Sequence, residues 1–167
     1  MSRIGKQPII IPAGVTVMRD GAMLVVKGPG GELRQAVHSA VRVTIADNSI
    51  TITVQRPTEP KQRALWGLFR TLVDNMITGV TTGYKRSLEV IGVGYKVAVS
   101  GNTVTLNVGY SHPVTVPLPD GVTATVEKNT LTLAGRDKQL VGEVAASIRR
   151  TTSFLISMRM RSLAFAI

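Results

Sequence analysis

The residues of this chain that could carry out chemistry are few and stand far apart. The two histidines, His38 and His112, have neither a carboxylate nor a second histidine at the spacing of a metal site or a proton-transfer pair. The ten acidic residues stand singly, whereas general acid–base catalysis needs two carboxylates near one substrate bond. The chain has no cysteine, which excludes disulfides, thiolate metal sites and a cysteine nucleophile. We therefore expect no enzymatic activity, no metal, no cofactor and no small-molecule substrate.

A glycine-containing run, Gly92–Lys96, partly resembles a phosphate-binding loop. Such a loop works by leading into a helix whose N-terminal amides face the phosphate. Val97 and Val99 instead follow with the alternation that is typical of a strand. The run therefore predicts a tight turn or bulge where the backbone comes close to another group, and not a dinucleotide site.

The chain is strongly basic, with a net charge of +10 and an isoelectric point near 10.7, which predicts an acidic partner such as nucleic acid. No Lys or Arg lies between Val97 and Glu127, a stretch predicted to form core and neutral sheet. Basic residues flank this stretch and would form one rim if the following helix packs on the sheet, with tyrosines nearby to stack on bases. Alternatively, basic residues at a sheet edge prevent aggregation. The residues are Lys85, Arg86, Lys96, Arg136, Lys138, Arg149 and Arg150, with Tyr84, Tyr95 and Tyr110.

The elements that must position these residues are mostly strands. Period-two alternation predicts strand pairs across short turns at 47–48, 101–102 and 128–129, where Gly and Asn are suited to positive φ. Apolar residues between Leu65 and Met76 fall at helical spacing and predict a helix that begins near Pro60 and ends at Gly79. A second apolar stripe runs from Leu140 to Ile148, with Asp137 placed to cap its N-terminus.

The two halves of the chain repeat one pattern. A shift of 81 residues lays Val41 on Val122 and Ile50 on Leu131 without a gap. We therefore predict an α+β fold with two similar domains, each a small, mostly antiparallel sheet packed with one helix. The expected boundaries are 1–82 and 83–150, followed by a tail at 151–167. Each half carries ten basic and five acidic residues, so neither is a detached basic arm.

No segment has the pattern of a targeting signal or a membrane helix. The early apolar run Ile9–Ile11 lies between two prolines and is too short for a signal peptide. No stretch reaches the roughly 18 to 20 apolar residues that a membrane helix needs. We expect a cytoplasmic protein that does not bind a membrane.

Five stretches of the chain resemble, in order and spacing, the motifs of the bacterial large-subunit ribosomal protein six family. They are Met1–Pro8 with Ile11–Val15, Val26–Leu33, Val90–Lys96, Val108–Val114 and Asp137–Ala146. The resemblance implies two copies of one α+β fold and no catalytic activity. It also implies binding to large-subunit ribosomal RNA, mainly through the second domain, near the sarcin–ricin loop where translation factors dock. Neighbouring large-subunit ribosomal proteins are the other implied partners.

This resemblance makes two loops of the second domain candidate RNA contacts. The first contributes Gly92, Gly94, Tyr95 and Lys96, and the second contributes Tyr110, Ser111, His112 and Pro113. Lys85, Arg86, Lys138, Arg149 and Arg150 complete the candidate set. The alternative is an RNA- or DNA-binding module that acts outside the ribosome, which composition alone does not distinguish from a ribosomal protein.

The chain departs from the family after Arg149. Members usually continue with a Pro-rich, basic segment that contains Tyr-Lys-Gly-Lys-Gly and is a main RNA-contacting tail. Residues 151–167 have a different, partly apolar sequence, as a frameshift would produce. They lack the lysines and glycines of the family's C-terminal contact, whereas Arg149 and Arg150 are still placed to reach phosphate.

Overall fold

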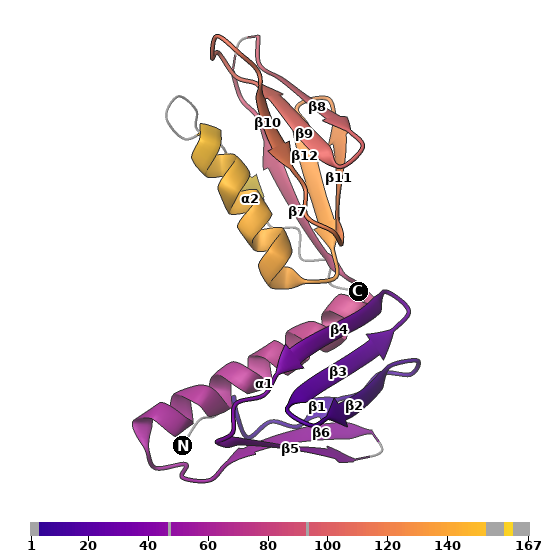
Figure 1. Ribbon diagram of the computed structural model, residues 1–167, viewed down its shortest axis with the longest axis vertical. Helices are drawn as coiled ribbons and strands as arrows, with labels where there is room; N and C mark the ends of the chain where they lie inside the picture. The colour runs from indigo at the N-terminus through magenta and orange to yellow at the C-terminus, as the bar shows by residue number, and fades with distance from the viewer. Residues whose placement is uncertain (1–3, 47, 93, 153–158, 162–167) are drawn as a thin grey trace. The chain divides into compact units, whose positions relative to one another are not determined.

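The structure is a computed structural model that describes residues 4–46, 48–92, 94–152 and 159–161. The chain divides into two compact units, Met1–Thr82 (unit 1) and Gly83–Ile167 (unit 2), which are described separately (Figure 1). No helix in the described part is long and apolar enough to cross a membrane.

Unit 1 consists of two three-stranded antiparallel sheets and one long helix. The sheets have the strand orders β1-β6-β5 and β2-β3-β4, and helix α1 packs against strands of both. Its core contains Leu24, Val26, Ile50, Trp66 and Val73, each nearly or fully inaccessible to solvent. The elements are β1 (Ile9–Ile10), β2 (Thr16–Asp20), β3 (Met23–Gly28), β4 (Gly31–Ala36), β5 (Val41–Ala46), β6 (Ser49–Val54) and α1 (Pro60–Thr81).

Unit 2 repeats this arrangement and adds one strand. Its sheets have the orders β10-β9-β8 and β11-β12-β7-β13, and helix α2 packs on β7 and β12 (Figure 1). Buried Leu88, Leu106, Leu131, Leu133 and Ile148 form the centre of its core. The elements are β7 (Tyr84–Glu89), β8 (Lys96–Ser100), β9 (Thr103–Asn107), β10 (Val114–Pro117), β11 (Val122–Glu127), β12 (Thr130–Gly135), α2 (Lys138–Thr152) and β13 (Arg159–Arg161).

The strand pairing confirms the predicted fold class and internal repeat. In unit 1, β5 pairs with β6 so that Ile45 lies opposite Ile50. In unit 2, β11 pairs with β12 so that Val126 lies opposite Leu131, which are the same positions shifted by 81 residues. The pairing of β1 with β6 likewise corresponds to that of β7 with β12. Strand β13 pairs with the other edge of β7 and has no counterpart among the described strands of unit 1.

The first helix extends beyond its predicted end. It continues past Gly79 to Thr81, and the residue with positive φ is Gly83, at +71°. Gly79 is buried where the turn between β3 and β4 packs on the helix, and the Gly30 amide donates a hydrogen bond to the Val80 carbonyl at 2.7 Å. The prediction that the helix ends at Gly79 was wrong because this glycine belongs to a packing contact.

The start of the second helix agrees with the prediction. The Asp137 carboxylate accepts hydrogen bonds from the backbone amides of Gln139 at 2.8 Å and Leu140 at 3.4 Å, which is N-cap geometry. Among the predicted turns, positive φ occurs at Gly101 and at Lys128, so at 128–129 the lysine and not the asparagine adopts it. Residue 47 of the remaining predicted turn lies outside the described residues.

Candidate nucleic-acid interface

The two loops with candidate RNA contacts emerge from the same end of unit 2. Residues 90–95 connect β7 to β8, and residues 108–113 connect β9 to β10. In the β8–β9 pair, Lys96 lies opposite Asn107, so the first loop enters its strand where the second loop leaves its own. We call this end of unit 2 the loop end, and it lies at the top of Figure 1.

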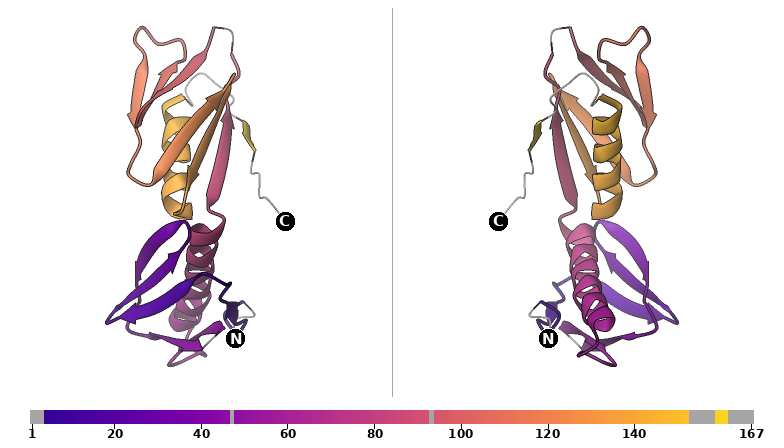
Figure 2. Two further views of the ribbon diagram at one scale, coloured as in Figure 1. Left: turned by 90° about the vertical axis from the view of Figure 1, so that its right-hand side faces the viewer. Right: turned by 90° about the vertical axis from the view of Figure 1, so that its left-hand side faces the viewer.

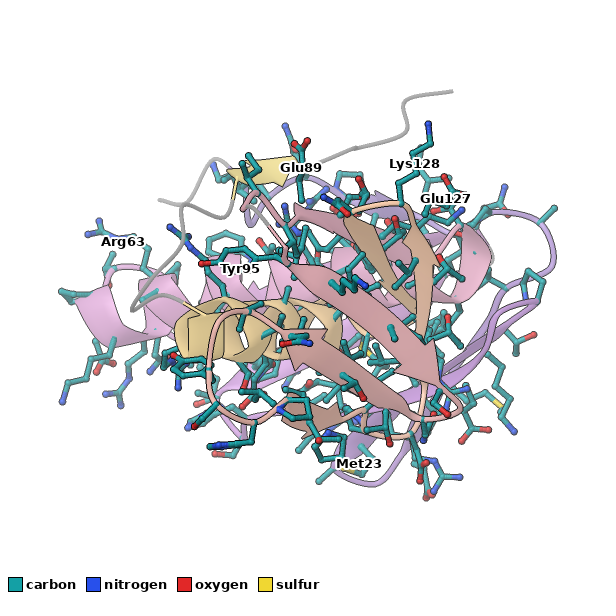
Figure 3. The ribbon with its side chains drawn as sticks, turned by 90° about the horizontal axis from the view of Figure 1, so that it is seen from above. Met23, Arg63, Glu89, Tyr95, Glu127 and Lys128 are labelled. Atoms are coloured by element: carbon teal, nitrogen blue, oxygen red, sulfur yellow. The ribbon has the colours of Figure 1, made fainter. Side chains whose placement is uncertain are left out.

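Tyr95 connects the two loops. Its ring lies so close to Gly92 that a Cβ on this glycine would meet ring atoms Cδ2 and Cε2 at 1.8 and 1.9 Å. On the other side, a Cβ on Gly109 would lie 3.4 Å from Cε1 of the same ring. The ring is half-buried and also packs against the core of unit 2. Figure 3 views this end and labels Tyr95.

The remaining loop residues present polar groups to solvent. Gly94 has a φ of +78° and is exposed, and the predicted turn leads into strand β8, as its alternation indicated. Lys96 is exposed at the first position of β8. In the second loop, Ser111, His112 and Pro113 are exposed, whereas Tyr110 is half-buried against the core. Each loop therefore has one tyrosine held by the protein, with exposed polar residues next to it.

The basic candidates form two groups and not one rim. Arg149 and Arg150 are exposed in the last turn of α2. This helix ends toward the loop end of unit 2 (Figures 1 and 2). Lys138 begins the same helix, and its Nζ lies 5.5 Å from the ring centroid of Tyr84 at the start of β7. Because an α-helix rises 1.5 Å per residue, Lys138 and Arg149 lie about 16 Å apart along the axis.

Lys85 and Arg86 follow Tyr84 in β7 and belong with the Lys138 group. Lys85 is exposed, whereas Arg86 is half-buried because the two residues point to opposite faces of the sheet. The loop end thus combines both candidate loops with Arg149 and Arg150, and the second group lies where β7 and α2 begin. The stretch without Lys or Arg between Val97 and Glu127 was predicted to form core and neutral sheet, and Val104, Leu106 and Val122 within it are buried.

Sequence reasoning did not foresee that the Tyr95 ring lies between Gly92 and Gly109. The two loops are separated by two strands, and only the pairing of β8 with β9 brings them together. The available signal was a glycine three residues before Tyr95 and another, Gly109, two residues after the second of these strands. In the part of the chain that the structure describes, no group of three or more His, Asp or Glu side chains is placed to hold a metal ion.

The chain matches a known family over both units. Residues 11–83 and 91–159 match the family model of ribosomal protein L6. The chain belongs to the ribosomal protein L6 family. The two matched segments correspond to unit 1 and to most of unit 2, and the second extends ten residues past Arg149.

Curated relatives support the same assignment. The chain is 52% identical over 151 residues to the large ribosomal subunit protein uL6 of Desulforapulum autotrophicum, covering 90% of this chain and 84% of the relative. It is 54% identical over 151 residues to that of Nitratidesulfovibrio vulgaris, covering 90% of this chain and 83% of the relative. The protein of the same name from Shouchella clausii is 48% identical over 151 residues, covering 89% of this chain and 84% of the relative.

Membership of the L6 family settles the broad role of the chain. It is a structural component of the bacterial ribosome, in the cytoplasm, and not an enzyme. The sequence resemblance to large-subunit ribosomal protein six is confirmed by the family match and by relatives at about half identity. The individual RNA contacts remain predictions.

Proposed function

We propose that this L6-family chain binds large-subunit ribosomal RNA chiefly through the loop end of unit 2, and that it also contacts neighbouring large-subunit ribosomal proteins. The observation that carries the proposal is that the two candidate loops lie side by side and that α2 ends toward the same end of unit 2. Five exposed residues there offer charge or hydrogen bonds to RNA. They are Lys96, Ser111, His112, Arg149 and Arg150.

The binding mechanism that these residues support is electrostatic and dependent on shape. Lys96, Arg149 and Arg150 would neutralise phosphates and release counterions, which gives affinity with little sequence information. Ser111 and His112 offer hydrogen bonds to the ribose 2′-hydroxyl or to base edges, in a loop shaped by the positive φ of Gly109 and by Pro113. Lys85, Arg86 and Lys138 form a second group that would contact a separate phosphate segment.

Sedimentation tests the ribosomal part of this proposal. Tagged chain is expressed in bacteria, and the lysate is separated on gradients at moderate and at high salt. We expect the chain to remain with the large subunit through the high-salt wash. If the chain stays at the top of both gradients, residues after Arg149 are replaced by the family's usual ending. A failure of this replacement to restore association would contradict the proposed binding to large-subunit ribosomal RNA.

We also propose that the bound RNA lies near the region where translation factors dock, as the resemblance to the family implies. The chain has no cysteine, so a single cysteine can carry an iron chelate that cleaves nearby RNA. Ser111→Cys in the second candidate loop is the probe. Ser100→Cys is the matched control because Ser100 is exposed in the same unit, at the far end of β8. We expect cleavage at the sarcin–ricin loop to be stronger from position 111 than from position 100, and equal cleavage would contradict this placement.

A further inference from the structure

The ring of Tyr95 occupies the space that any side chain at position 92 would need. A Cβ on Gly92 would lie 1.8 Å from Cδ2, 1.9 Å from Cε2 and 2.8 Å from Cγ of the ring. Carbon atoms this close lie far inside van der Waals contact, so an alanine at 92 has to displace the ring. The φ of Gly92 lies outside the left-handed region, so the close approach alone requires glycine.

The opposite edge of the ring faces Gly109 of the second loop. Gly109, with a φ of +86°, places its Cα so that a Cβ would lie 3.4 Å from Cε1 and 3.7 Å from the hydroxyl oxygen of Tyr95. The ring also packs against the core of unit 2 and is half-buried. Well-packed side chains resist displacement because few voids are open to them. A shift of the ring away from Gly92 is therefore a shift toward Gly109 in the second loop.

We propose that Tyr95 is a positioning residue, a spacer that sets the separation of the 90–95 and 108–113 loops and so preforms the RNA-binding loop end. This inference rests on the proposed function and gives Tyr95 a different task from stacking on a base. A preformed loop end loses less conformational entropy on binding, which raises affinity without an added contact. Lys96 follows Tyr95 directly, and Tyr110 to Pro113 follow Gly109, so the spacing governs exposed residues of both loops.

A double-mutant cycle tests the spacer. The four proteins are the full chain, Gly92→Ala, Tyr95→Leu and the double variant, and the probe is deproteinised bacterial large-subunit ribosomal RNA at fixed salt. We expect Gly92→Ala to weaken RNA binding roughly tenfold when Tyr95 is present and by less than about twofold when leucine has replaced it. The effects of substitutions at two residues in contact are not additive, because each depends on the other residue. Gly142→Ala is the matched control because a Cβ there meets nothing within 4 Å and Gly142 lies outside the loop end.

Two further measurements separate a positioning role from a purely structural one. Thermal unfolding of each variant reports stability, and Tyr95→Phe tests whether a ring without the hydroxyl restores the affinity that Tyr95→Leu loses. Coupling in RNA affinity, with rescue by phenylalanine, supports the spacer. The spacer would be overturned by losses of RNA affinity that simply add in the double variant, by coupling that is seen in thermal unfolding but not in RNA affinity, or by a failure of Tyr95→Phe to restore affinity. If Gly92→Ala does not fold, the comparison of Tyr95→Leu with Tyr95→Phe decides by the same criteria. Absence of RNA binding by the unmodified chain would overturn the proposed function, and this inference with it.

Discussion

At the scale of single residues, the basic side chains of unit 2 differ in what surrounds them. Lys138 lies over the ring of Tyr84, with 5.5 Å between Nζ and the ring centroid, a geometry in which the ring attracts the cation. Arg149 and Arg150 lie in the last turn of α2, where the helix dipole favours positive charge. Because these charges also stabilise the protein, a loss of RNA affinity must be separated from a loss of stability, and the salt dependence of binding makes that separation.

The first prediction concerns the number of phosphate contacts. Lys138→Ala and Arg149→Ala should each weaken RNA binding. Each should also reduce the magnitude of the salt slope, which is the slope of the logarithm of the binding constant against the logarithm of the salt concentration, by roughly 0.7 to 0.9, as expected for the loss of one phosphate contact. The measurement is RNA affinity across a salt series. Lys61→Ala removes an exposed charge from α1 in unit 1 and is the control. An unchanged slope would remove the substituted residue from the set of contacts.

A second prediction concerns Glu32 in unit 1, which pairs with two cations. Its carboxylate lies 2.6 Å from Arg34 Nε and 3.1 Å from Lys27 Nζ, and hydrogen bonds from Arg34 and then Lys27 hold its pKa below the ordinary value of 4.5. A depressed folded-state pKa gives stability that is present above the unfolded-state pKa and lost as pH falls through the folded value.

We therefore expect Glu32→Gln to lower the free energy of unfolding at about pH 7 more than at about pH 3. Urea unfolding at the two pH values measures this difference. Arg34→Ala removes the partner with the largest effect on the pKa and should reproduce part of the change. An equal effect of Glu32→Gln at both pH values would show that the ion pairs do not contribute.

At the scale of elements, glycine has different tasks in the turn of unit 1 and in the helix of unit 2. The turn between β3 and β4 packs on the end of α1, and a Cβ on Gly30 would lie 2.9 Å from the Val80 carbonyl oxygen. This oxygen belongs to the backbone and accepts the Gly30 hydrogen bond, so it is not free to move aside. Gly142 lies inside α2, where a Cβ meets nothing within 4 Å.

The same substitution should therefore have opposite effects at these two positions. Gly30→Ala is expected to destabilise the chain by about 1–3 kcal/mol through overpacking. Gly142→Ala is expected to stabilise it by about 0.5–1 kcal/mol, because alanine favours a helix interior more than glycine does. Chemical unfolding monitored by circular dichroism measures both changes. Destabilisation by both variants would mean that α2 has a close neighbour at position 142.

At the scale of the whole molecule, local sequence signals predicted the fold but not the grouping of the candidate site. Alternation and turn residues are local, so the strands and, through the turn predicted at 128–129, the register of Val126 with Leu131 could be anticipated. The meeting of Tyr95 with Gly109 depends on strand pairing between segments that alternation alone does not assign. The basic residues divide into two groups because α2 separates Lys138 from Arg149, a consequence of helix length that charge counting does not reveal.

The last prediction asks whether total charge or its placement determines RNA binding. Each half of the chain carries ten basic and five acidic residues, so net charge does not favour either unit. Two triple variants remove the same charge from exposed positions. The first replaces Lys96, Arg149 and Arg150 of unit 2 by alanine, and the second replaces Arg42, Lys61 and Arg63 of unit 1. The position of Arg63 is labelled in Figure 3.

We expect the unit 2 variant to reduce the salt slope of RNA binding by roughly 2 to 3 and the unit 1 variant to reduce it by less than about 1. The reason is that counterions are released only where a cation lies against a phosphate. Three charges far from the RNA act only through long-range attraction, which salt screens, so their removal lowers affinity weakly. Equal slopes for the two variants, measured on folded protein, would mean that the chain binds RNA through its overall charge. Such a result would contradict a dedicated loop end, because a surface that recognises RNA by shape must depend on where its charges lie.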